Sequence, residues 1–60
     1  MNDLINWIYE AEGKIIYFEA MRSNEPDEEA YKNAHIFWCV RLDALRAVAD
    51  DLKKIGVYLL

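Results

Sequence analysis

His35 and Cys39 are the residues whose types and spacing most resemble a chemical site. They lie four positions apart, so their side chains would share one face of a helix. This spacing suits two ligands of a zinc ion, but a closed site needs two more, which a symmetric pair of chains would have to supply. Both lie in or beside an apolar run, as is typical of a core cysteine and a partly buried histidine. We therefore expect no metal here.

Carboxylates offer a second arrangement, because Glu12 and Glu19 are seven apart and would share a helical face. Carboxylate-bundle metal sites also need a Glu-x-x-His pair, but Lys32 stands three positions before His35. No nucleophile, base and oxyanion donors are assembled in the sequence, and no glycine-rich loop is present to bind phosphate. The sequence indicates that this is not an enzyme and that it uses no cofactor.

The apolar spacing predicts a first helix over about residues 3–23. One row repeats every four and then three residues, and a second row lies beside it, so the apolar face is too wide for one partner helix. The first row is Leu4, Ile8, Ala11, Ile15 and Phe18, and the second is Ile5, Tyr9, Gly13, Ile16 and Ala20. Gly13 indicates either a tolerated surface glycine or a close helix crossing.

A loop over residues 23–26 separates this helix from a second one over about 26–56. Pro26 suits a first helical turn, and the acidic residues after it suit the positive end of the helix dipole. The inner apolar row is Tyr31, His35, Trp38, Leu42, Leu45, Ala49, Leu52, Gly56 and Leu59. A row beside it reads Ala34, Phe37, Arg41, Ala44, Val48, Asp51 and Ile55. The helix is expected to end near Gly56, although Leu59 would also allow it to continue.

The two helices predict an all-α fold, an antiparallel two-helix hairpin in a single domain over residues 1–60. The lengths would be roughly 30 Å and roughly 45 Å, so the second helix would lack intrachain cover beyond Ala49. We expect the hairpin to self-associate into a four-helix bundle, as a homodimer or higher oligomer. The residues expected at this contact are Ile5, Tyr9, Gly13, Ile16, Ala20, Phe37, Arg41, Val48, Leu52, Ile55 and Leu59.

Size and composition support self-association. Sixty residues of which 55% are hydrophobic carry more apolar surface than a hairpin buries, and the single cysteine excludes an internal disulfide. The net charge of −4 and the scattered basic residues argue against nucleic acid as a partner. No apolar run approaches the ~18 residues of a membrane span, and no signal peptide is present at the start. We expect a cytoplasmic protein without a membrane partner.

Several residues outside the main rows are candidates for binding another protein, because aromatic and charged side chains dominate such contacts. They are Trp7, Tyr17, Met21, Asp27, Glu28 and Tyr58. The acidic ones have a structural explanation at the helix start and could instead dock a basic partner. Arg41 lies within an apolar row and is expected to form a salt bridge with Glu12 or another carboxylate.

The function expected from these features is a small non-enzymatic interaction module. It would be a regulator or stoichiometric inhibitor of another protein, for example one encoded by a phage or mobile element. The alternative is a structural module that joins copies into an assembly. In length and layout the chain also resembles the small helical dimers that bind RNA in plasmid copy control. That resemblance would require an exposed basic face, and the seven basic residues here lie on several sides of the two helices.

Overall fold

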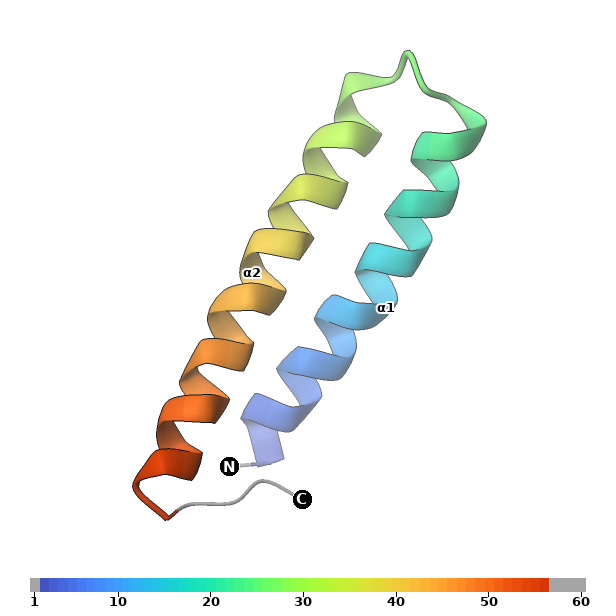
Figure 1. Cartoon of the computed structure of the whole chain (residues 1–60). Coiled ribbons are helices and arrows are strands. Elements are labelled where there is room, and N and C mark those ends of the chain that lie inside the picture. The colour runs from blue at the N-terminus through green and yellow to red at the C-terminus, as the bar shows by residue number, and fades with distance from the viewer. Residues whose placement is uncertain (1, 57–60) are drawn as a thin grey trace.

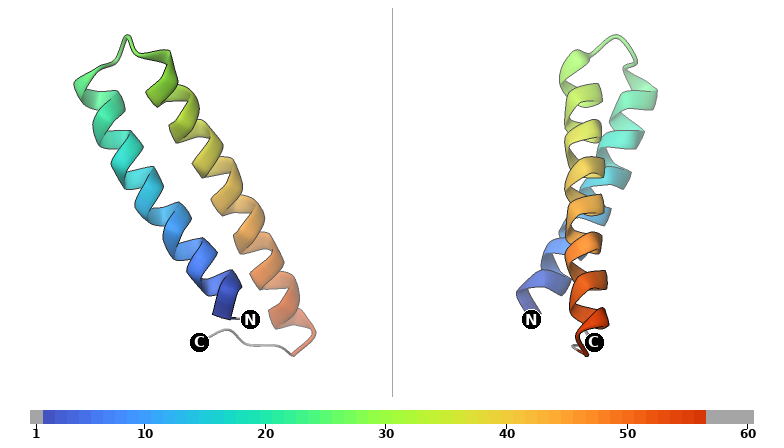
Figure 2. Two further views of the ribbon diagram at one scale, coloured as in Figure 1. Left: turned by 180° about the vertical axis from the view of Figure 1, so that it is seen from behind. Right: turned by 60° about the vertical axis from the view of Figure 1, so that its left-hand side comes forward.

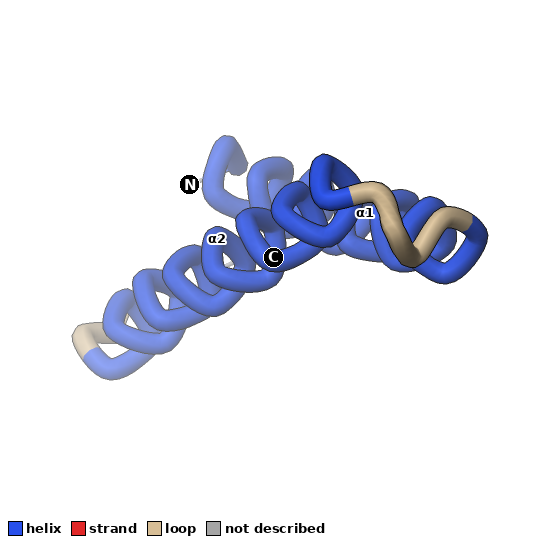
Figure 3. The backbone as a smooth tube through the Cα atoms, turned by 90° about the horizontal axis from the view of Figure 1, so that it is seen from above, coloured by secondary structure: helices blue, strands red, loops and turns tan. Residues whose placement is uncertain are grey.

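The computed structural model describes residues 2–56 and consists of two antiparallel helices, α1 (Asn2–Asn24) and α2 (Glu29–Lys54), joined by a short loop (Figure 1). The predicted all-helical hairpin is thereby confirmed. The molecule is a rod whose Cα atoms span 45 × 15 × 13 Å. The helix axes are inclined to each other, so the helices cross in the side view of Figure 2 and diverge in the axial view of Figure 3.

The two predicted inner rows meet between the helices. The core consists of Leu4, Ala11 and Leu42, with side chains 9%, 0% and 7% exposed. The remaining members of the two rows up to residue 52 are half-buried, namely Ile8, Ile15, Phe18, Tyr31, His35, Trp38, Leu45, Ala49 and Leu52. The 4-3 spacing therefore identified the side of each helix that faces the other, and a hairpin of this length encloses very little.

The loop differs from the prediction, because α2 begins at Glu29 and not at Pro26. The Glu28 amide donates to the Glu25 carbonyl oxygen at 3.1 Å, which closes a turn with Pro26 at its second position. The fixed φ of proline suits that position as well as it suits a first helical turn. Asp27 and Glu28 consequently precede the helix, and only Glu29 lies in its first turn.

The helix α2 ends where the sequence predicted, near Gly56. The amide of Ile55 donates to the Leu52 carbonyl oxygen at 3.2 Å, and that of Gly56 to Lys53 at 3.0 Å. Gly56 has a φ of +90°, a conformation that favours glycine and stops the helix. The alternative of a continuous helix through this residue is excluded, and the candidate residues Tyr58 and Leu59 lie outside the described part of the chain.

The part of α2 that extends beyond α1 is shorter than predicted. With 23 and 26 residues, α1 and α2 are roughly 35 Å and roughly 39 Å long. The first helix begins earlier and ends later than the predicted range of about 3–23. Leu52, near the end of α2, is still half-buried. Gly13 is exposed, and a Cβ atom built on it would meet nothing within 4 Å. No close helix crossing therefore occurs at Gly13 within one chain.

Candidate functional site

The end of the hairpin near the loop contains a chain of polar contacts through His35. Arg22 Nη1 donates to His35 Nδ1 at 2.9 Å, and His35 Nε2 lies 3.8 Å from Cys39 Sγ. A guanidinium only donates, so Nδ1 is the acceptor in this contact. Both imidazole nitrogens of His35 thus have a neighbour in the hairpin, Arg22 at Nδ1 and Cys39 at Nε2.

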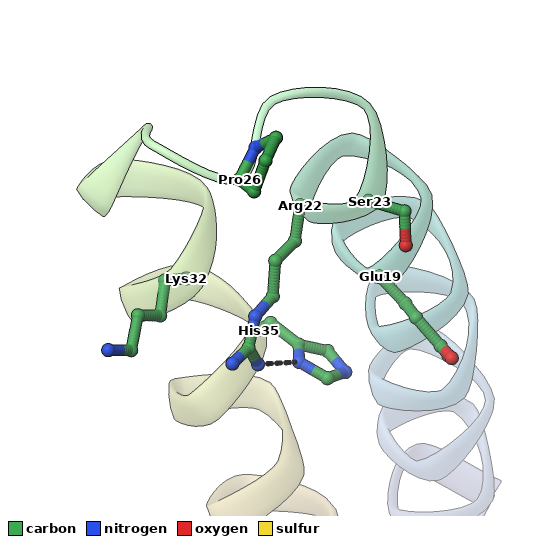
Figure 4. Close-up of a pocket in the computed structure, with 6 residues that line it drawn as sticks. All are labelled: Glu19, Arg22, Ser23, Pro26, Lys32 and His35. Atoms are coloured by element: carbon green, nitrogen blue, oxygen red, sulfur yellow. Dashed lines mark hydrogen bonds between the residues drawn. The ribbon is translucent and has the colours of Figure 1, made fainter.

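Sequence reasoning missed the Arg22–His35 contact, although a signal for it was present. The inner row of α1 ends at Phe18 in the prediction, and one further step of four residues leads to Arg22. Its long side chain continues the row with a charged group instead of an apolar one. Figure 4 shows this side chain reaching between the helices to the imidazole ring.

A surface hollow adjoins this contact and opens to solvent (Figure 4). Its lining residues are Glu19, Arg22, Ser23, Pro26, Lys32 and His35. The guanidinium of Arg22 already binds the imidazole, and Glu19 brings a carboxylate to the same rim. Within residues 2–56, no group of three or more His, Cys, Asp or Glu side chains could hold a metal ion. The hollow carries side chains of both charges at its rim.

Glu12 forms its ion pair with Arg46 and not with Arg41. The Glu12 Oε1 to Arg46 Nη2 distance is 3.5 Å, and both side chains are about half exposed, at 42% and 59%. Arg41 instead lies over the ring of Trp38, with its Cζ atom 5.8 Å from the ring centroid. The predicted Arg41–Glu12 salt bridge is wrong, because Arg41 lies on the opposite flank of α2 from Arg46.

The Glu12–Arg46 pair shows which flanks of the two helices share a face of the hairpin. Each residue turns an α-helix by about 100°. Ile16 therefore lies on nearly the same side of α1 as Glu12, whereas Val48 lies about 160° around α2 from Arg46. The structure therefore separates the residues predicted for self-association. The predicted contact residues of α1 lie on its Glu12 side and its back, namely Ile5, Tyr9, Gly13, Ile16 and Ala20. Those of α2 lie on the flank opposite Arg46, namely Phe37, Arg41, Val48 and Ile55.

A second surface brings together residues that the sequence treated separately. Trp7, Tyr17 and Met21 lie about 140° to 180° around α1 from Glu12, which places them on the same side of the hairpin as Phe37 and Val48. We call these five residues the aromatic face. Tyr17 packs edge-on against Phe18 with ring centroids 4.9 Å apart, and Phe37 packs in the same way against Trp38 at 5.3 Å. The exposed rings of Tyr17 and Phe37 are thus each supported by a ring from the helix interface.

The remaining candidate residues are distributed as follows. Leu52 is half-buried and belongs to the inner row of α2, and Asp27 and Glu28 are exposed in the loop. The acidic charge of the chain is concentrated at this end, with Glu25 and Glu29 beside them. Among the described helices, neither is long and apolar enough to cross a membrane.

Comparison of the chain with protein-family models, with curated proteins and with solved structures gives no match.

Proposed function

We propose that this chain is a small non-enzymatic interaction module, a helical hairpin that self-associates into a four-helix bundle and regulates or inhibits another protein. The observation that carries the proposal is the amount of apolar surface left outside the hairpin core. Among the described residues, nine large hydrophobic side chains are between 46% and 74% exposed, against three buried core residues. The nine are Trp7, Tyr9, Ile16, Tyr17, Ile36, Phe37, Val40, Val48 and Ile55.

The accessible area supports the same proposal. The chain exposes 4580 Å², whereas a compact monomer of its 7.1 kDa mass would expose about 4,100 Å². The difference between these two areas is somewhat smaller than the roughly 600–1,000 Å² that each partner buries in a standard interface. Large apolar side chains that lie exposed side by side are typical of surfaces that bind another chain.

The test of self-association is solution mass over a dilution series, by light scattering and sedimentation, with helicity followed by circular dichroism. We expect a dimer or higher oligomer at micromolar concentration and a loss of helicity as it dissociates, because the hairpin core alone is small. A fully helical monomer across the series would refute the bundle.

The alternative function, an assembly module, differs in what the oligomer leaves exposed. Replacing Trp38 by phenylalanine leaves Trp7 as the only tryptophan, and Trp7 is 49% exposed in the single chain. If the oligomer keeps Trp7 accessible to acrylamide, the α1 part of the aromatic face (Trp7, Tyr17 and Met21) is free for another protein, as a regulator requires. Complete protection of Trp7 in a stable oligomer would favour assembly as the function.

A further inference from the structure

One row of α2 has the properties of a seam that meets its own copy. We call Phe37, Arg41, Ala44, Val48, Asp51 and Ile55 the outer row, in which Ile55 is the residue that caps the end of α2. All six side chains are exposed, and the three large apolar ones, Phe37, Val48 and Ile55, are 57%, 50% and 74% exposed. The six positions fall within about 80° of the helix circumference, on a flank that does not face α1. A row this narrow with 4-3 spacing is typical of a helix–helix seam.

The spacing of the outer row is the same when read from either end. Its steps are four, three, four, three and four residues, so the row is symmetric about position 46. If two copies of α2 lie antiparallel with a two-fold axis at that level, every position of the row meets another position of the row. Phe37 then faces the partner's Ile55, Arg41 faces the partner's Asp51, and Ala44 faces the partner's Val48.

The residue types fit this antiparallel register. Opposite charges meet at the Arg41–Asp51 positions, and symmetry repeats the pair on the other side of the axis. Large apolar groups meet at both ends of the row, and alanine at the centre lets the two backbones approach. In a parallel pair, Arg41 would face the partner's Arg41, and the two Asp51 carboxylates would face each other, so like charges would meet at both positions.

The charged members of the row have only weak contacts within one chain. Asp51 lies 3.9 Å from Lys54, and both side chains are more than three-quarters exposed. Arg41 lies on the Trp38 ring with its guanidinium reaching solvent. Exposed pairs of this kind contribute little, so both groups are available to a second chain.

We propose that the outer row of α2 is the interface of an antiparallel homodimer in the register Phe37–Ile55, Arg41–Asp51 and Ala44–Val48. This inference rests on the proposed self-association and specifies its surface and its orientation. The seam covers residues 37–55, a length of roughly 27 Å. A two-fold axis perpendicular to the paired helices leaves both copies of α1 on the same side of the α2 pair, as a four-helix bundle requires.

The test is a charge exchange measured by sedimentation over a dilution series. Arg41→Glu and Asp51→Lys should each raise the dimer dissociation constant about tenfold, because like charges then face each other twice per dimer. The double variant should return to within about threefold of the wild type, since both pairs are restored with the signs exchanged. An equimolar mixture of the two single variants should also associate, as a heterodimer in which every pair is opposite in sign.

Rescue in the double variant cannot arise inside one chain, because positions 41 and 51 are roughly 15 Å apart along the helix. Lys53→Glu and Asp50→Lys are the matched controls. They make the same charge reversals at exposed positions on the far side of α2 and should leave the dissociation constant unchanged. Circular dichroism at high concentration checks that each variant keeps the helicity of the hairpin.

Three results would overturn the inference, and they differ in what else they affect. A wild-type chain that stays monomeric would remove the self-association as well. A wild-type dimer that is insensitive to both single reversals would retain self-association but exclude the outer row. A dimer that is weakened by each reversal and not restored in the double variant would exclude the antiparallel register.

Discussion

Replacing Leu42 by alanine tests the small core on which the hairpin depends. Leu42 is 7% exposed and is the one buried side chain of α2. Losing three carbon atoms forfeits about 2.4 kcal/mol of apolar transfer free energy, and a residual cavity raises the measured cost of such changes to about 3–5 kcal/mol. The neighbouring row residues are only half-buried, so water or side chains can partly fill the space, and we expect about 3 kcal/mol.

This loss is comparable to the whole stability of a domain of this size, about 3–5 kcal/mol. The assay is urea unfolding followed by circular dichroism at one fixed protein concentration, because the proposed association would add to the apparent stability. Ile16→Ala is the matched control, since Ile16 is 70% exposed and should change the free energy of unfolding by less than about 1 kcal/mol. If Leu42→Ala costs no more than Ile16→Ala, the assignment of the core is refuted.

The other predictions concern single contacts. Replacing Arg46 by alanine should lower the free energy of unfolding by at most about 1 kcal/mol. The loss should shrink in high salt, because the side chains of Arg46 and Glu12 are both about half exposed; a large, salt-independent loss would contradict this. Gly13→Ala should stabilise the hairpin by about 1 kcal/mol in thermal melts, since a Cβ there meets nothing. A destabilised Gly13→Ala would instead reveal close packing against a second chain. Gly56→Ala should lower the melting temperature, because Gly56 has a positive φ. Leu45→Asp should abolish helicity, because it places a charge in the inner row.

The side of each helix that faces the other was predictable, because the hydrophobic effect imposes its period on the sequence. Leu4, Ala11 and Leu42 all belong to rows identified by spacing alone. The loop was not predictable in the same way, since Pro26 has the same fixed φ in a turn and in a first helical turn. Local propensity does not distinguish these two roles, and the outcome depends on how the chain must turn to bring α1 and α2 together.

To predict the candidate surfaces, one must know which flank of α1 lies beside which flank of α2. The spacing of residues within one helix does not give this information. Both helices are right-handed and antiparallel, so the flank of α1 bearing Glu12 lies beside the flank of α2 bearing Arg46. Grouping residues by row alone joined Ile16 with Val48, which the hairpin places on opposite flanks. The charge of Arg41 suggested a carboxylate partner, but its position relative to α1 excluded Glu12 and left the Trp38 ring.

The arrangement makes α2 the central element of the proposed assembly. Its inner row binds α1, and its outer row is available to a second copy, whereas α1 has one row in the hairpin core and an exposed row through Tyr9 and Ile16. If folding of the hairpin is coupled to pairing of α2, the folded fraction rises with the concentration of the chain. The exposed row of α1, which pairing through α2 does not use, would then be presented to another protein mainly above that concentration. An inhibitor built in this way would act with a threshold set by its own dimer dissociation constant.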